Sequence, residues 1–281
     1  MKRYRILPFD FDTRVRSLDP IDEHLEEQVK QQLYKNRENT IFRLKNEFGQ
    51  RQAEIKVQNF IDLGSKPISV IAFHNNFFNQ VRTAFVMSAY YPALTGACAL
   101  GERILNHLVL TLREDYRSTP EYKAIYRKDS FDDWSVAIGT LVAWDVLLPS
   151  AADNFRMLME HRHNALHFRP ETDHNSRELA LAAINCLQAI IGEQFSGFGP
   201  QPWFITTIPG EIYIKKEWEA RPFIAKVYLP NAVLVGPWHQ VASILPQLQI
   251  VDPDPVATTS DGSDDEFSRL RHAFRQGGLQ G

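Results

Sequence analysis

The sequence contains only two cysteines among 281 residues, Cys98 and Cys186. Both fall among apolar residues at helical spacing, which is typical of free thiols inside a protein core. So few cysteines argue against a disulfide framework and against a cysteine-based metal site. They favour a reducing compartment, and we therefore expect a cytoplasmic protein.

Long hydrophobic runs are also missing. The first residues, MKRYRILPFDFD, lack the apolar core of a signal peptide. The uncharged stretch from Thr83 to Gly101 approaches membrane-spanning length, but Pro92 divides it, and Tyr, Ser, Thr and Gly residues dilute it. Two buried helices that meet at a turn explain this stretch better, so we expect no contact with a membrane.

Two motifs of common hydrolases are absent. The sequence has no Gly-rich phosphate loop and no Gly-x-Ser-x-Gly nucleophile elbow, which argues against P-loop nucleotide hydrolysis and serine acyl transfer. A strong charge of one sign is absent too, because the net charge is −3. A polyanionic partner would therefore have to bind a local basic patch.

The sequence does contain a long segment of helical periodicity, over residues 67–198. Apolar residues recur at helical spacing there, and Pro92, Pro149 and Pro170 lie at or near the junctions between helices. We therefore expect a mainly α protein built on a helical bundle. Its helices are predicted at roughly 74–91, 93–116, 132–147, 150–167 and 174–195.

Three further segments flank this bundle. Residues 1–66 are highly charged, and their spaced apolar residues predict an N-terminal helical extension of one long or two short helices. Residues 199–250 predict a small C-terminal antiparallel β appendage, with three or four strands among the runs WFITTI, EIYIKKEW, FIAKVYL and AVLV. Residues 251–281 are rich in Pro, Asp, Ser and Gly and are expected to form a disordered tail.

The most informative segment is RHNALHF, from Arg162 to Phe168. Arg162 lies in the apolar stripe of the fourth predicted helix, so its guanidinium points inward. Pro170 disfavours helical geometry at Arg169, and the helix is expected to end near His167. An arginine that keeps its charge can hold a phosphate, and a histidine that titrates near neutrality can move a proton. The stripe consists of Phe155, Leu158, Met159, Ala165 and Leu166.

The order of Arg162, the polar His163 and His167 resembles the signature of the HEPN (higher eukaryotes and prokaryotes nucleotide-binding) family. That signature is an arginine, usually followed by Asn, Asp or His, with a histidine four to six residues later. The resemblance extends over residues 70 to 196 and implies a HEPN-like helical bundle. It also implies a metal-independent endoribonuclease without a cofactor, in which Arg162 and His167 are catalytic and His163 supports them.

The resemblance further implies RNA as substrate and a homodimer in which two motifs line one cleft. Many family members are toxins or antiviral defence effectors, so such a role and a regulatory protein partner are also expected. Residues five apart on an ideal helix point away from each other, so Arg162 and His167 converge only through an irregular helix end or across a symmetric dimer. We expect the dimer to form through the helices that carry Phe155, Leu158 and Met159.

Other polar residues are expected to assist this pair. Arg156, His161 and Arg169 complete a local basic patch and are candidate RNA-binding residues. Glu102 and Asn106 lie four apart at the border of the buried stripe of the second predicted helix. A carboxylate at such a border can hold an inward arginine, and the resemblance implies that polar residues on this helix orient the catalytic pair.

Several alternatives remain open from the sequence. Arg162 could form a purely structural ion pair, and Glu102 could be an ordinary solvated residue. His163 and His167 are four apart and could bind zinc in a hydrolase, but Asn164 stands where such enzymes carry a glutamate base. A non-catalytic HEPN-like module that binds a nucleotide or a protein is the alternative from a different functional class.

Overall fold

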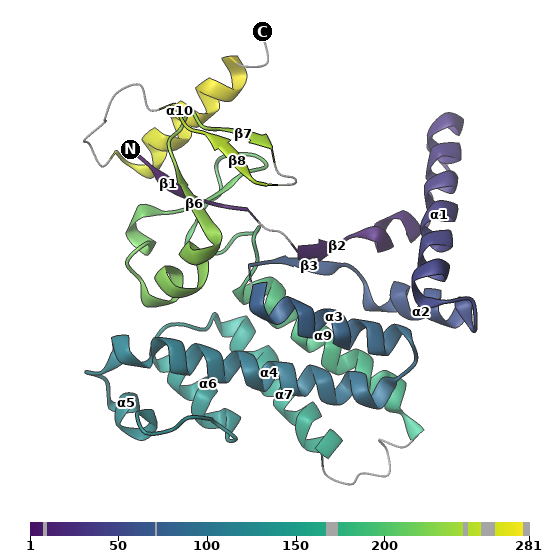
Figure 1. Ribbon diagram of the computed structural model, residues 1–281, viewed down its shortest axis with the longest axis horizontal. Helices are drawn as coiled ribbons and strands as arrows, with labels where there is room; N and C mark the ends of the chain where they lie inside the picture. Colours follow the sequence, from purple (N-terminus) through teal and green to yellow (C-terminus); the bar gives the residue numbers. More distant parts are fainter. Residues whose placement is uncertain (8–9, 71, 167–173, 244–246, 254–261, 278–281) are drawn as a thin grey trace. The chain divides into compact units, whose positions relative to one another are not determined.

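The computed structural model describes residues 1–7, 10–70, 72–166, 174–243, 247–253 and 262–277 (Figure 1). This part of the chain is mainly helical, as predicted, with a small antiparallel sheet. It forms two compact units, which we call the helical unit (Phe9–Ser196) and the β unit (Met1–Pro8 with Gly197–Gly281). None of the described helices has the length and apolarity needed to cross a membrane.

The helical unit is built around α4, which packs against α3, α6, α7 and α9 (Figure 1). Gly101 lets α6 and α7 pack closely against α4. A Cβ added at this position would lie 2.6 Å from Leu158 Cδ2 and 2.9 Å from the Trp134 ring. The helices of this unit are α1 (Glu27–Phe48), α2 (Ala53–Leu63), α3 (Ala72–Val86), α4 (Tyr90–Leu112), α5 (Pro120–Ile125), α6 (Trp134–Ala143), α7 (Pro149–Leu166) and α9 (Ser176–Gln194). Two strands, β2 (Asp10–Asp12) and β3 (Lys66–Ser69), pair antiparallel, and two 3-10 helices are η1 (Arg14–Leu18) and η2 (Arg113–Tyr116).

The five helices predicted between residues 67 and 198 are present as α3, α4, α6, α7 and α9. The boundary predicted at residue 66 differs from the structure. Strand β1 (Arg3–Ile6) belongs to the β unit, while α2 packs against α3 and α9 and is part of the bundle. Asn59 of α2 is 1% exposed and donates a hydrogen bond to the carbonyl of Phe85 at 3.1 Å. The predicted N-terminal extension is therefore divided between the two units.

The β unit contains a four-stranded antiparallel sheet in the order β4, β5, β1, β6. Its strands are β1 (Arg3–Ile6), β4 (Phe204–Ile205), β5 (Ile212–Ile214) and β6 (Ala232–Val235), and a separate ladder pairs β7 (Gln240–Ser243) with β8 (Gln249–Val251). Residues 223–229 were predicted as a strand, but Ile224–Tyr228 form a helical segment. Aromatic packing overrides the strand pattern there, because Tyr228 is fully buried with its ring 5.5 Å from that of Trp203.

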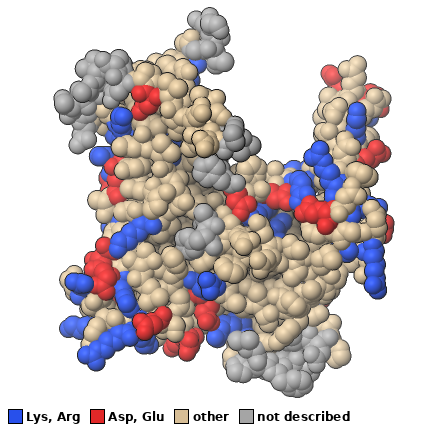
Figure 2. Space-filling model, in the orientation of Figure 1, with Lys and Arg blue, Asp and Glu red and all other residues tan. Residues whose placement is uncertain are grey.

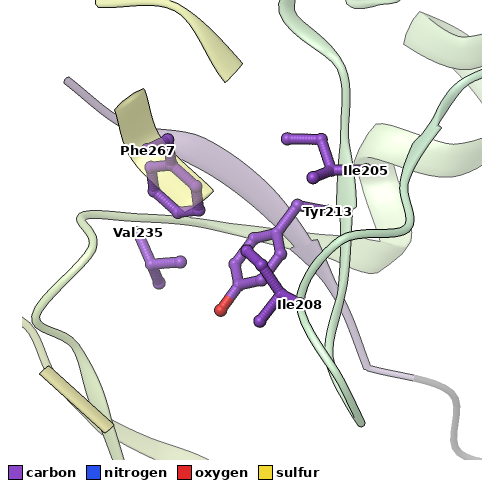
Figure 3. Packing of buried hydrophobic residues seen from close by; sticks show 5 residues of the cluster. All are labelled: Ile205, Ile208, Tyr213, Val235 and Phe267. Carbon is purple, nitrogen blue, oxygen red and sulfur yellow. The ribbon is translucent and has the colours of Figure 1, made fainter. Parts of the chain in front are cut away.

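The tail predicted to be disordered contains helix α10 (Asp264–Gly277). Phe267 of α10 is 0% exposed, and its ring meets that of Tyr213 at 4.9 Å in a T-shaped contact. Figure 3 shows Phe267 and Tyr213 with Val235, Ile205 and Ile208 in the core of the β unit. The helix has few apolar residues, so its sequence resembles a disordered tail, but Phe267 fills a core site.

A buried polar network also fixes α10. Arg271 is 5% exposed, and its Nε and Nη2 each donate to the Glu211 carboxylate at 2.7 Å. The Tyr213 hydroxyl donates to the same carboxylate at 2.7 Å, and Arg5 Nη2 lies 3.1 Å from it. Burial alone would raise the pKa of Glu211, but the hydrogen bonds from Arg271 and Tyr213 and the charge of Arg5 lower it to about 2.

His239 completes this network and is fully buried. Its Nδ1 lies 2.7 Å from the Gly236 carbonyl, and its Nε2 lies 2.7 Å from Arg5 Nη1. A carbonyl only accepts and an arginine only donates, so His239 is neutral with its proton on Nδ1. Burial lowers the pKa of His239 to about 4. The hydrogen bond with the Gly236 carbonyl opposes this shift, and the positive charges of Arg271 and Arg5 add to it.

Acidification is expected to destabilise the β unit in two steps. The pKa of His239 lies below that of an unfolded histidine, so its contribution is complete above pH 6.5 and is lost as the pH falls toward 4. That shift of about 2.5 units in pKa corresponds to at most about 3.4 kcal/mol at ~1.36 kcal/mol per unit. The contribution of Glu211 follows between pH 4.5 and about 2. Urea unfolding measured from pH 7 to pH 4 should show the first step.

His239→Gln should flatten the dependence of the unfolding free energy on pH between 6.5 and 4. The exposed His24 provides a matched control, since His24→Gln should leave that slope unchanged. In the helical unit, burial and the nearby charges of His107 and Arg103 lower the pKa of His74 to about 4. His74 therefore gives the helical unit its own dependence of unfolding free energy on pH. An unchanged slope in the His239→Gln protein would contradict the neutral buried histidine.

Candidate functional site

Arg162 lies near the end of α7 and forms an ion pair with Glu102 of α4. Arg162 Nε is 3.0 Å from Glu102 Oε2, and the two side chains are 29% and 32% exposed. The indole Nε1 of Trp134 donates to the same carboxylate oxygen at 3.1 Å. The guanidinium carbon of Arg162 also lies 5.8 Å from the centre of the Trp134 ring. We call these three residues the Arg162 cluster.

Packing fixes Trp134, and Trp134 in turn positions the ion pair. Trp134 is the first residue of α6, whose N-cap Asp133 accepts a hydrogen bond from the Ser135 amide at 2.9 Å. The Trp134 side chain is 1% exposed and rests against Gly101. Sequence reasoning anticipated Glu102 as a partner of Arg162 but missed Trp134. The available signal was the Asp-Asp-Trp-Ser run, which is typical of a helix start.

Asn106, the second polar residue predicted to support the site, acts on the loop before α6. Its amide nitrogen donates to the carbonyls of Glu102 and Phe131 at 2.9 and 3.3 Å, and its oxygen accepts from the Phe131 amide at 2.7 Å. The two hydrogen bonds with Phe131 hold the loop that leads to Trp134. Asn106 therefore supports the Arg162 cluster through the backbone.

The ion pair leaves most of the guanidinium available. Nε of Arg162 makes the closest contact with Glu102, at 3.0 Å, and Nη1 and Nη2 form no hydrogen bond with the described residues. These two nitrogens form the part of the fork that matches two oxygens of a phosphate. Arg162 is therefore held by one edge and can bind an anion with the other.

The predicted basic patch is weaker than the sequence indicated. His163 is exposed beside Arg162, whereas burial lowers the pKa of the half-buried His161, even with Glu160 nearby, so His161 is neutral at pH 7. Arg156 lies on the surface and pairs with Asp153 at 2.6 Å. The catalytic candidate His167 and the RNA-binding candidate Arg169 lie outside the described residues.

Two residues of the apolar stripe of α7 are used inside the bundle. Phe155 and Leu158 are 0% exposed, and Leu158 packs at Gly101 of α4. Phe155 and Leu158 therefore cannot supply the predicted dimer interface, because the same periodicity that marks a contact face also marks a core face. Met159 is only partly buried, and the dimer itself stays a prediction. Among the apolar residues of α7, Met157 is 49% exposed and lies outside that stripe.

Neither cysteine contributes a reactive group to the site. Cys98 and Cys186 are free, and burial raises the pKa of Cys98 to about 12, even though the charge of Arg162 opposes that shift. Within the described ranges, no group of three or more His, Cys, Asp or Glu side chains is arranged to hold a metal ion. The zinc alternative depends on His167, which lies outside those ranges.

No family model, curated protein or solved structure matches the chain. The function must therefore be inferred from the geometry of the Arg162 cluster and from the residues around it.

Proposed function

We propose that this protein is a metal-independent endoribonuclease of the HEPN type that acts as a toxin or an antiviral defence effector. The observation that carries the proposal is the state of Arg162, whose closest contact with Glu102 is made by Nε, while its two terminal nitrogens form no hydrogen bond with the described residues. An arginine fixed by one edge at a helix end beside an exposed histidine is suited to a phosphate.

The proposed reaction is an internal transfer at phosphorus. The ribose 2′-oxygen attacks the adjacent phosphate and forms the 2′,3′-cyclic phosphate, while the bond from phosphorus to the 5′-oxygen breaks. A base removes the 2′-hydroxyl proton, and an acid protonates the departing 5′-oxygen. His167 serves as the acid or the base, a role worth about 10² to 10⁴ in rate. Arg162 stabilises the charge that grows on the phosphate oxygens.

Each remaining residue has a defined part in this proposal. Glu102 and Trp134 set the orientation of the guanidinium, Asn106 holds the loop before Trp134, and His163 contacts the RNA next to Arg162. A homodimer could bring Arg162 of one copy to His167 of the other, since residues five apart on one helix diverge. Such a dimer has to use a surface other than the buried stripe of α7.

The purified protein is expected to cleave single-stranded RNA in excess EDTA, because the reaction uses only side chains. The products should carry 2′,3′-cyclic phosphate and 5′-hydroxyl ends. Polynucleotide kinase should therefore label the 5′ ends without phosphatase treatment, and acid should open the cyclic ends. Activity that EDTA abolishes and zinc restores would instead favour the zinc hydrolase.

A second candidate is a non-catalytic module that binds a nucleotide or a protein. The observation in its favour is the Glu102–Arg162 ion pair, because a structural arginine at the border of a core makes the same contact. This candidate predicts that RNA stays intact under all conditions of the assay. A protein partner recovered with the intact chain would then identify its role.

A further inference from the structure

A second site in the helical unit is a cavity of about 570 Å³, which is in the range of small-molecule sites. It lies among β2, η1, β3, α3, α2 and the end of α1, and it shares no residue with the Arg162 cluster. Acidic and basic side chains alternate over β2 and β3 on the face drawn in Figure 2. Its lining contains three carboxylates and three cationic side chains.

These charges are unevenly paired. Arg14 takes two carboxylates, because it lies 2.8 Å from Asp12 and 2.5 Å from Glu47. Lys66 is 3% exposed, pairs with Asp10 and donates to the amide oxygen of Asn79. With one arginine using two of the three carboxylates and the lysine using the last, the third cation is left without one.

That third cation is Arg82. It is 6% exposed, donates to the Gly64 carbonyl at 2.8 Å and to the Gln188 amide oxygen, and among the described residues has no ion pair. Burial lowers the pKa of Arg82 to about 10. The negative charge of Asp12 opposes this shift, and the positive charge of Arg14 adds to it. A buried charge bonded only to neutral groups is costly to the folded protein. An anion in the cavity would remove that cost.

Most of the other lining residues are apolar or aromatic, and the rest are Thr13, Asn79 and Thr83. Phe11 of β2 is 51% exposed at the cavity, and the ring of Phe60 lies 5.3 Å below the Arg14 guanidinium. Side chains of this kind fit a ring or a hydrocarbon body, whereas the buried cations Lys66 and Arg82 fit a negative group.

We propose that this cavity binds a small organic anion, with its carboxylate or phosphate against Arg82 and its aromatic or aliphatic body against Phe11 and Phe60. This proposal does not depend on the ribonuclease activity, because the two sites share no side chain. The ligand gives Arg82 a directly paired counter-ion, which the described residues do not supply.

The test uses four small probes in isothermal titration calorimetry with the full chain. Phenyl phosphate and benzoate combine a ring with an anionic group, inorganic phosphate lacks the ring, and benzyl alcohol lacks the charge. We expect at least one ring-bearing anion to bind with Kd at or below about 1 mM, and at least tenfold tighter than the other two probes. The tighter of the two ring-bearing anions identifies the preferred negative group. No binding of either one at 10-fold higher concentration overturns the proposal.

Arg82→Met should weaken binding of the tighter probe at least tenfold. Arg16→Met, which removes a 76% exposed arginine of η1, serves as the matched control. Phe11→Ala changes an exposed residue and should weaken binding of the ring-bearing anion but leave binding of inorganic phosphate unchanged. This variant tests the proposal even if Arg82→Met fails to fold. Affinity that Phe11→Ala leaves unchanged would place the probe elsewhere. Arg162→Ala should retain full binding whether or not RNA is cleaved.

Discussion

Arg162→Ala should reduce RNA cleavage by about 10² to 10³-fold, because alanine removes the fixed charge that stabilises the phosphate in the transition state. His167→Ala should reduce cleavage by a similar factor, about 10² to 10⁴, through loss of the proton carrier. The rate of cleavage of a labelled single-stranded RNA measures both effects. If the chain is a toxin, cells that the parent protein kills should tolerate either variant.

Controls separate chemistry from folding in this experiment. His174 is exposed and has no role in the proposed reaction, so His174→Ala should cleave RNA like the parent. Arg162→Lys keeps a charge but loses the planar fork and should fall between the parent and alanine. Circular dichroism should show unchanged helical content in all four variants. Retained cleavage in the His167→Ala protein would remove that residue from the mechanism, and unfolding of Arg162→Ala would identify a structural ion pair.

Glu211→Gln should destabilise the β unit by about 3 to 5 kcal/mol, because it leaves Arg5 and Arg271 buried without their shared carboxylate. Arg271→Met should cost less, since Arg5 still lies 3.1 Å from Glu211 and the network keeps one ion pair. Urea unfolding followed by tryptophan fluorescence measures both. Glu217 is exposed and forms no ion pair with the described residues, so Glu217→Gln provides the control at the same charge change.

A loss below about 1 kcal/mol in the Glu211→Gln protein would mean that the network behaves as a solvated surface pair. The same result would conflict with the low exposure of Glu211 and Arg271, which are 8% and 6% exposed at their side chains. Equal losses in Glu211→Gln and Arg271→Met would indicate that Arg5 contributes little.

The parts of the fold that follow local patterns could be predicted from the sequence. Helices such as α4 and α7 carry long apolar stripes, and a stripe reports its own periodicity without reference to the rest of the chain. Pairing between distant residues leaves no such mark, so the position of β1 beside β5 and β6 could not be foreseen. Helix α10 was missed for the same reason, because the partners of Phe267 and Arg271 lie far away in sequence.

In the candidate site, too, local patterns could be predicted from the sequence and contacts set by packing could not. Arg162 lies within one predicted apolar stripe and Glu102 at the border of another, and that placement made Glu102 a candidate partner of Arg162 or His167. The structure shows the contact with Arg162. Trp134 was missed because its role depends on how close α6 approaches α4 at Gly101, which is a property of packing. The stripe of α7 misled the dimer prediction, since periodicity cannot tell a core face from an interface.

The antiparallel pairing of β1 with β5 and β6 has a consequence for the order of folding during synthesis. Arg3 reaches Asp264 and the carbonyl of Gly262, so the first strand made has partners that leave the ribosome only after the whole helical unit. Domains tend to fold as they emerge, and the bundle can therefore form while β1 is still unpaired. The nascent chain then carries an open strand edge until residues 204 to 277 are complete, and a ribosome that stalls before that point leaves the edge exposed to other chains.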